Sequence, residues 1–210
     1  MIRLYGFPLS TNAERVRLAL AHKRLPVEHV LVDPADRSEV RRVSGQDLVP
    51  VIEDEGRVVH DSMQIVRYLE ERCPEPPLYP RDPARRAETL IFIDWFNRVW
   101  KRPPNAMEAE LGKTDPDRAQ IAAWSREMKE ALDLFEGLLT GRDFLMGDVF
   151  SAADVAAFPF LKYALGGAER LRAENDTELF HKILVDHQPL GDGHPRLTDW
   201  IRRVDRLPRA

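Results

Sequence analysis

The chain has 210 residues, of which 43% are hydrophobic, enough for one large domain or two small domains with real cores. Its 31 Lys and Arg against 35 Asp and Glu give a net charge of -4, which indicates neither a nucleic-acid-binding nor a membrane-surface protein. No apolar run approaches the roughly 20 residues that cross a bilayer, and no secretory signal pattern opens the chain, so we expect a cytoplasmic protein. Its single cysteine, Cys73, excludes an internal disulfide, and the scattered histidines match no metal-binding motif.

Short apolar stretches and helix-spaced stretches alternate over the first 75 residues. In chain order the pattern predicts a strand at 2–6, a helix at 13–23, a strand at 27–32, a weakly helical stretch at 36–43, strands at 49–53 and 57–60, and a helix at 62–72. The first strand–helix–strand unit implies parallel pairing through a right-handed crossover, and the later hairpin adds antiparallel strands to the same sheet. Residues 1–75 should therefore form an α/β domain.

Two helix starts in this domain carry capping signals. Thr11 and Glu14 have the spacing of a capping box, which predicts Thr11 as the N-cap of the first helix and places Ser10 just before it. Asp61 and Gln64 repeat that spacing at the start of the 62–72 helix. Helix N-termini attract anions because their first N–H groups lack partners and the helix dipole is positive there. The two starts therefore suit a small peptide that carries carboxylates and a thiol.

Five prolines between residues 73 and 83 mark a domain boundary, because such a segment suits neither a helix nor a central strand. We expect a Pro-rich linker at 76–83 and an all-helical domain at 84–210. Its apolar spacing predicts helices at 84–100, ending near Pro103-Pro104, at 116–139, from Ser151 onward and at 195–204. Ser151 and Asp154 match a capping box for the third of these, which is a structural role.

Four motifs, in this order and at these separations, carry a resemblance to a known family. They are Ser10 five residues before Arg15-Val16, the strand Leu48-Val49-Pro50-Val51, the pair Asp61-Ser62, and the Gly-Asp-x-x-Ser-x-x-Asp motif within 144–158. Together they resemble the cytosolic glutathione S-transferase family over essentially the whole chain. The resemblance implies an α/β thioredoxin-like N-terminal domain followed by an all-α helical C-terminal domain. It also implies a homodimer that conjugates glutathione to a small apolar electrophile and needs no metal.

The resemblance assigns Ser10 the stabilisation of the glutathione thiolate. A hydroxyl that donates a hydrogen bond to the charged sulfur favours the thiolate and lowers the thiol pKa from about 8.5 toward neutrality. The alternative is that Ser10 only helps to begin the helix. Thr11 and Asn12 are substitutes for the catalytic role, because such loops can present a neighbouring hydroxyl or amide.

The other expected contacts with glutathione also rest on the resemblance. The bond before Pro50 should be cis, which exposes the main chain of Val49 to the cysteinyl residue of glutathione. The hydroxyl and N–H of Ser62 should bind the γ-glutamyl carboxylate, and Asp61 should hold its amino group. Both residues could equally be simple helix caps, and the two interpretations are compatible.

The chain departs from the family pattern at two of these places. Leu48 stands where many members carry Gln or Lys, so polar contact with the peptide must come from Gln46, or from Arg37, Arg41 or Arg42 toward the glycine carboxylate. Asp61 stands where Glu or Gln is more frequent. These departures favour, as an alternative, a non-catalytic protein of the same fold that binds glutathione or another ligand. A glutathione-dependent peroxidase or isomerase is a third possibility, because the same thiolate supports either reaction.

Overall fold

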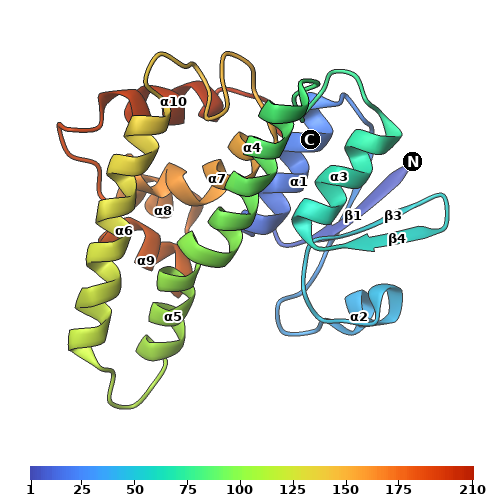
Figure 1. Ribbon diagram of the computed structural model, residues 1–210. Helices are drawn as coiled ribbons and strands as arrows, with labels where there is room; N and C mark the ends of the chain where they lie inside the picture. The colour runs from blue at the N-terminus through green and yellow to red at the C-terminus, as the bar shows by residue number, and fades with distance from the viewer. The chain divides into compact units, whose positions relative to one another are not determined.

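The computed structural model describes residues 1–210 in two units, Met1–Arg81 together with Leu207–Ala210, and Asp82–Arg206. The first unit contains one mixed sheet (Figure 1), in the order β2-β1-β3-β4. Its strands are β1 Ile2–Gly6, β2 Val27–Leu31, β3 Val51–Asp54 and β4 Arg57–His60. β1 pairs parallel with β2 and antiparallel with β3, which pairs antiparallel with β4. The predicted parallel pair with an added antiparallel hairpin is confirmed.

Three helices cover this sheet: α1 Thr11–His22, α2 Ser38–Ser44 and α3 Ser62–Arg72. α1 and α3 pack against each other on one face, and α2 lies on the other (Figure 1). The stretch at 36–43, expected to be only weakly helical, forms α2 because Val40 is completely buried against Tyr5 and Val51 of the sheet. Burial of an apolar side chain therefore compensates for weak helical propensity.

The Pro-rich segment that follows α3 is tied to the helices by a buried ion pair. Lys23 at the end of α1 pairs with Glu70 of α3, and both side chains are almost completely buried. Glu70 also accepts hydrogen bonds from the N–H groups of Leu78 and Tyr79, at 3.0 and 3.3 Å. Lys23 donates to the carbonyl of Pro76 at 2.7 Å. One ion pair therefore fixes the course of the Pro-rich segment on the first unit.

The last four residues, which we expected within the helical domain, group with the first unit. The N–H of Ala210 donates to the carbonyl of Arg17 on α1 at 3.2 Å. The guanidinium of Arg209 lies 3.3 Å from the carboxylate of Glu14. No local pattern in the sequence indicates these contacts, because Arg209 and Glu14 are 195 residues apart and Ala210 is similarly far from Arg17.

The second unit is entirely helical, as predicted. It comprises α4 Pro83–Trp95, the π-helical turn η1 Phe96–Trp100, α5 Arg102–Leu111, α6 Arg118–Leu138, α7 Ala152–Leu161, the 3-10 turn η2 Lys162–Ala164, α8 Gly167–Glu174, α9 Leu179–His187 and α10 Pro195–Asp205. The helical segment before them ends at Trp100, as predicted, but Pro103-Pro104 lies in the first turn of α5, a helix that was not predicted. The first turn of a helix tolerates proline because its N–H groups have no helical partner. The short helices α8 and α9 were not predicted.

Every residue of α7 is buried, and its start is held by one carboxylate. The capping box of Ser151 and Asp154 is present in both directions, which confirms the structural role expected for the pair. Asp154 also accepts from the N–H of Leu145 at 2.9 Å and from the indole N–H of Trp200 on α10 at 2.8 Å. Burial raises the pKa of Asp154, although these hydrogen bonds oppose the change. The carboxylate thus joins the 144–150 loop, α7 and α10.

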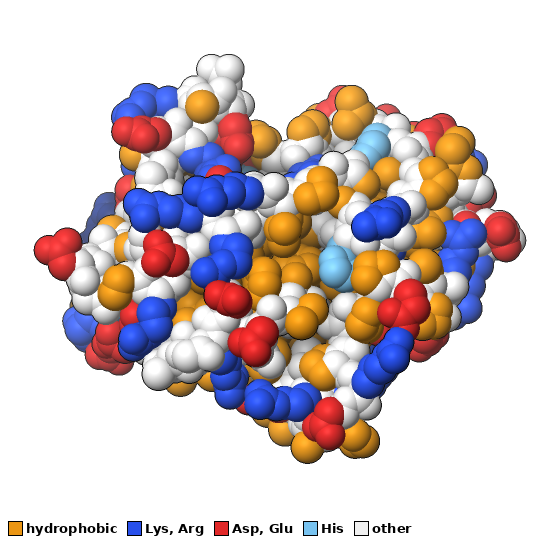
Figure 2. Space-filling model, turned by 90° about the horizontal axis from the view of Figure 1, so that it is seen from above, with side chains coloured by type: hydrophobic (Ala, Val, Ile, Leu, Met, Phe, Trp, Pro, Cys, Tyr) orange, Lys and Arg blue, Asp and Glu red, His pale blue; other side chains and the backbone are white.

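No helix combines the length and the apolar character that crossing a membrane requires. In the face drawn in Figure 2, Lys and Arg side chains are interspersed with Asp and Glu and with exposed hydrophobic side chains. No single sign of charge dominates that face.

Candidate active site

A tight turn presents Ser10 at the start of α1. The N–H of Ser10 donates to the carbonyl of Phe7 at 3.3 Å, with Pro8 at the second position of the turn, where its fixed φ is favoured. Ser10 is the N-cap of α1, because its Oγ accepts from the N–H of Ala13 at 3.2 Å. The prediction that Thr11 is the N-cap is therefore wrong. The N-cap lies one residue earlier than predicted, and Glu14 pairs with Arg209.

In this geometry the hydroxyl of Ser10 can still donate a hydrogen bond while its oxygen caps the helix. A serine hydroxyl has one donor and two acceptor sites, and the bond from Ala13 uses only an acceptor site. Ser10 is half-buried, whereas Thr11 is 5% exposed. Of the two hydroxyls, that of Ser10 is therefore the more accessible to a ligand.

Asp61 and Ser62 begin α3. Oδ1 of Asp61 accepts from the N–H groups of Met63 and Gln64 at 3.0 and 3.1 Å, so Asp61 is the N-cap. Its backbone has φ 67° and ψ 122°, a combination that costs a non-glycine residue about 1–3 kcal/mol and is found mainly at functional sites. Ser62 is buried. The expected capping role of Asp61 is confirmed.

A buried arginine connects the two helix starts. Arg15 of α1 is 1% exposed, and its Nη1 lies 3.3 Å from Oδ1 of Asn12 and 3.2 Å from Oγ of Ser62. Burial lowers the pKa of the Arg15 guanidinium to about 9, and the charge of Asp61 opposes the change. A buried cation is stabilised by an additional anion. Two helix N-termini and this guanidinium therefore form a region that favours carboxylates or a thiolate.

Arg15 was not predicted as a site residue, although it is part of the Ser10-to-Arg15 motif. The helical spacing of the sequence could have shown that Arg15 faces inward. Arg15 lies four residues after Thr11 and three before Leu18, both of which are buried, so all three share the inward face of α1.

The bond between Val49 and Pro50 is cis, as expected. Pro50 is buried directly before β3, whose ladder begins at Val51. The N–H and C=O of Val49 are therefore outside the sheet pairing. The side chain of Val49 packs against the same apolar cluster as Phe7, whose carbonyl anchors the turn of Ser10.

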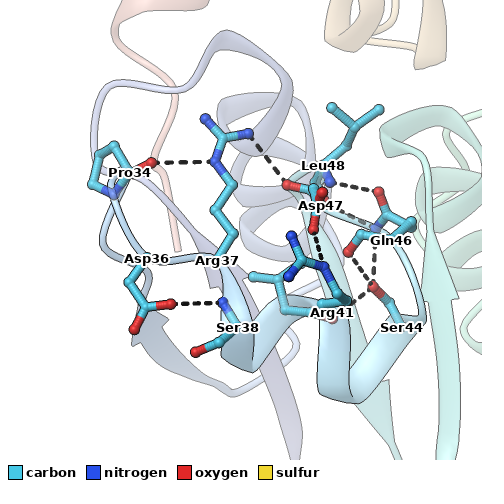
Figure 3. A network of polar contacts seen from close by, with 10 residues as sticks. Pro34, Asp36, Arg37, Ser38, Arg41, Ser44, Gln46, Asp47 and Leu48 are labelled. Atoms are coloured by element: carbon cyan, nitrogen blue, oxygen red, sulfur yellow. Dashed lines mark hydrogen bonds and ion pairs between the residues drawn. The ribbon is translucent and has the colours of Figure 1, made fainter.

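The remaining candidates lie on α2, at its N-cap, and in the loop that joins it to β3 (Figure 3). The Gln46 side chain pairs with the backbone of Leu48, donating to its C=O at 2.8 Å and accepting from its N–H at 2.5 Å. Arg37 donates to the carbonyl of Asp47 at 3.2 Å, and its guanidinium lies 5.1 Å from the centre of the Phe7 ring. Arg41 pairs with the Asp47 carboxylate at 2.8 Å.

The structure thus brings together Asn12 and Ser62 at the Arg15 guanidinium, with Ser10 and Asp61 as the caps of the same two helices. Gln46 and Arg37 are engaged with the loop backbone. Leu48 itself is 70% exposed and offers no hydrogen-bonding side chain. No group of three or more His, Cys, Asp or Glu side chains has an arrangement that could hold a metal ion.

Comparison with known proteins identifies the family. Residues 4–77 match the model of the glutathione S-transferase N-terminal domain, and residues 118–203 match the model of the glutathione S-transferase C-terminal domain. Glutathione S-transferase GstB of Escherichia coli K12 is 30% identical over 170 residues, which cover 77% of this chain and 82% of that protein. The chain belongs to the cytosolic glutathione S-transferase family.

Two further proteins are similar over most of the chain. FtsZ-localized protein A of Caulobacter vibrioides is 33% identical over 166 residues, which cover 73% of each protein. The crystal structure of a glutathione S-transferase from Rhodospirillum rubrum F11 is 31% identical, with a TM-score of 0.74, over 98% of this chain and 88% of that one. The thioredoxin-like and helical units therefore agree with the family fold.

Proposed function

We propose that this member of the glutathione S-transferase family binds glutathione at the N-termini of α1 and α3 and conjugates it to a small apolar electrophile. The observation that carries the proposal is the buried Arg15 guanidinium, which contacts both Asn12 and Ser62. It combines a positive charge with two helix N-termini, and glutathione offers two carboxylates and a thiol. Membership of the family supports glutathione as the ligand.

In this proposal each predicted residue has one role. The hydroxyl of Ser10 donates to the glutathione sulfur while its oxygen keeps the bond from Ala13. The main chain of Val49, exposed beside the cis Pro50, pairs with the cysteinyl residue. The N–H and hydroxyl of Ser62 bind the γ-glutamyl carboxylate, and Asp61 holds the γ-glutamyl ammonium group. Asn12 and Thr11 remain the alternatives to Ser10, of which Asn12 is the less buried.

Two further side chains belong at the glycine end of the peptide. Gln46 holds the backbone of Leu48 and thereby the approach to Pro50, and Arg37 lies over the ring of Phe7. Catalysis would come from a larger thiolate fraction at neutral pH and from the alignment of sulfur with the electrophile. Ser10 is not covalently modified in this mechanism, and no metal takes part.

A turnover assay tests the proposal. Glutathione consumption is followed with a panel of aryl halides, epoxides and unsaturated carbonyl compounds, for the wild type and for Ser10→Ala. Thr114→Ala is the control, because Thr114 is exposed on the loop after α5 and loses only a surface hydroxyl. We expect turnover that Ser10→Ala lowers about tenfold or more near neutral pH. Absence of turnover across the panel, despite glutathione binding, would reject conjugation.

A non-catalytic binding protein is the second candidate. Leu48 offers no polar side chain and Gln46 is paired with its backbone, which leaves fewer contacts for the peptide. The relative from Caulobacter is named for its localisation with FtsZ and not for an enzymatic activity. Glutathione-dependent peroxidase or isomerase activity is a third candidate, and adding hydroperoxides and cis-enones to the panel separates it from conjugation.

The proposal includes a cytoplasmic homodimer. A dimer interface needs exposed apolar side chains, and large ones are found on the helical segment at 83–100 but not on α3. Ile65, Val66 and Leu69 of α3 are completely buried, whereas Ile91 of α4 is 71% and Val99 of η1 is 53% exposed. Light scattering should give twice the 24.2 kDa monomer mass. A monomer mass at micromolar concentration would reject the dimer.

A further inference from the structure

The Arg37 guanidinium holds separate loops of the first unit together. Arg37 is the N-cap residue of α2, but its side chain takes no part in capping. Instead, its Nη1 donates to the carbonyl of Asp47 at 3.2 Å and its Nε donates to the carbonyl of Pro34 at 3.4 Å (Figure 3). The guanidinium carbon lies 5.1 Å from the centre of the Phe7 ring. One side chain therefore links the loops before and after α2 to the segment that precedes α1.

Phe7 is the residue through which this contact reaches Ser10. Its carbonyl accepts the N–H of Ser10 at 3.3 Å and closes the turn that presents the hydroxyl. Its half-buried ring packs against the apolar cluster that includes Tyr5 and Val51. A guanidinium within about 6 Å of the centre of an aromatic ring is attracted to it. The orientation of Phe7, and with it the turn, therefore depends on Arg37 as well as on apolar packing.

The bond to Asp47 acts on the second loop, which leads to Val49 and the cis bond that follows it. Asp47 lies two residues before Val49, whose main chain is outside the sheet pairing. Between them, Leu48 has both its N–H and its C=O bound by the side chain of Gln46. Because Arg37 binds the carbonyl of Asp47, the backbone that approaches Val49 is fixed at successive residues.

We infer that Arg37 is a positioning residue that sets the Ser10 turn and the Val49 main chain relative to each other. In the proposed function these two groups bind the sulfur and the backbone of one cysteinyl residue, so their spacing decides whether the sulfur meets the hydroxyl. The inference rests on the proposed function for this consequence, but the order of the turn is measurable without glutathione. Direct binding of the glycine carboxylate by the remaining N–H donors of Arg37 is the competing interpretation.

The test uses glutathione and glutathione amide, in which a neutral carboxamide replaces the glycine carboxylate. Arg37→Gln is compared with Phe7→Leu and with the double variant. Arg57→Gln is the matched control, because Arg57 also lies over an aromatic ring of the same unit, that of Tyr68 at 4.8 Å. Amide hydrogen exchange is measured at Ser10, whose N–H donates to the carbonyl of Phe7. The absorbance of the bound thiolate is measured against pH with each peptide at saturation.

Arg37→Gln should speed exchange at Ser10 about three- to fivefold, the range expected for the loss of one exposed contact between a guanidinium and an aromatic ring. It should lower the thiolate fraction below the pKa about threefold, which is a rise of about half a unit in the thiol pKa, and equally for both peptides. Arg57→Gln should change neither value. In the Phe7→Leu background, where no ring remains, Arg37→Gln should leave exchange at Ser10 unaltered.

The inference fails if Arg37→Gln alone leaves exchange at Ser10 unchanged, or if its effect is undiminished in the Phe7→Leu background. It also fails if the thiol pKa shifts with glutathione and not with the amide, because Arg37 would then be a ligand of the glycine carboxylate. A wild type without a thiolate signal for either peptide would instead reject the proposed function, while exchange at Ser10 still decides the inference.

Discussion

Replacement of Ser10 separates two roles that the structure places on one hydroxyl. Its oxygen caps α1 through Ala13, and its proton is the proposed donor to the glutathione sulfur. Ser10→Ala removes both, so the free energy of unfolding should fall by about 1 kcal/mol for the lost cap. The thiol pKa should rise by at least one unit, which corresponds to about 1.4 kcal/mol and a tenfold smaller thiolate fraction below the pKa.

Ser10→Gly is the matched variant, because glycine at an N-cap costs only a few tenths of a kcal/mol. It should lose as much thiolate as Ser10→Ala while remaining nearly as stable as the wild type. Thiolate absorbance is titrated against pH with saturating glutathione, and stability is measured by denaturant unfolding. Turnover of both variants should recover in part at alkaline pH, where the thiol ionises without help.

Thr11→Ala distinguishes the neighbouring hydroxyl. Thr11 is the first residue of α1 and caps nothing, so this variant should lose only the packing of one buried side chain. A pKa shift in Thr11→Ala with none in Ser10→Ala would transfer the catalytic role to Thr11. A thiolate titration unchanged in all three variants would refute the serine mechanism.

Further predictions concern stability. Glu70→Ala leaves the buried Lys23 without its carboxylate and should cost about 3–5 kcal/mol in denaturant unfolding, whereas replacing both residues by Met should cost much less; equal losses would contradict this. Asp154→Ala leaves buried N–H donors of three segments without their acceptor, so the free energy of unfolding should fall by at least about 3 kcal/mol. A fall of less than about 1 kcal/mol would show that the carboxylate is not structural. Burial lowers the pKa of His22 in the folded protein below its ordinary value of 6.5. Between these two pKa values the unfolded chain binds more protons than the folded one, so the free energy of unfolding falls as the pH falls through this range. His22→Gln should remove part of this fall, and identical pH profiles for both proteins would contradict the assignment.

Sequence periodicity was sufficient where a local rule decides the structure. The strands at 2–6 and 57–60 and the helix at 62–72 agree with the structure to the residue, because alternation, a turn and a cap all indicate the same boundaries. The capping box of Ser151 and Asp154 was also recognised from spacing alone.

The sequence predictions differ from the structure where residues far apart in the chain determine the local conformation. Thr11 and Glu14 match a capping box, but Glu14 pairs with Arg209, and Ser10 caps the helix. Local spacing could not identify this partner. The segment at 84–100 ends at Trp100 as predicted, but the prolines that follow it also suit the first turn of a new helix, and α5 was missed for that reason.

In the candidate site, too, local motifs could be predicted from the sequence and contacts between distant residues could not. The residue types and order of Ser10, Pro50, Asp61 and Ser62 were readable from the sequence, and the cis bond before Pro50 followed from the family resemblance. Arg15 was not assigned, because its importance comes from contacts with both Asn12 and Ser62. The second of these residues lies 47 positions further along the chain.

Calorimetric titration of the wild type with glutathione tests the central claim most directly. The account predicts a saturable signal with a dissociation constant near millimolar or tighter, the usual range for a small metabolite. Ser62→Ala should weaken binding, because it removes the hydroxyl that Arg15 holds at the start of α3. Absence of any saturable heat up to about ten times that concentration, or unchanged affinity in Ser62→Ala, would contradict a glutathione site at these two helix N-termini.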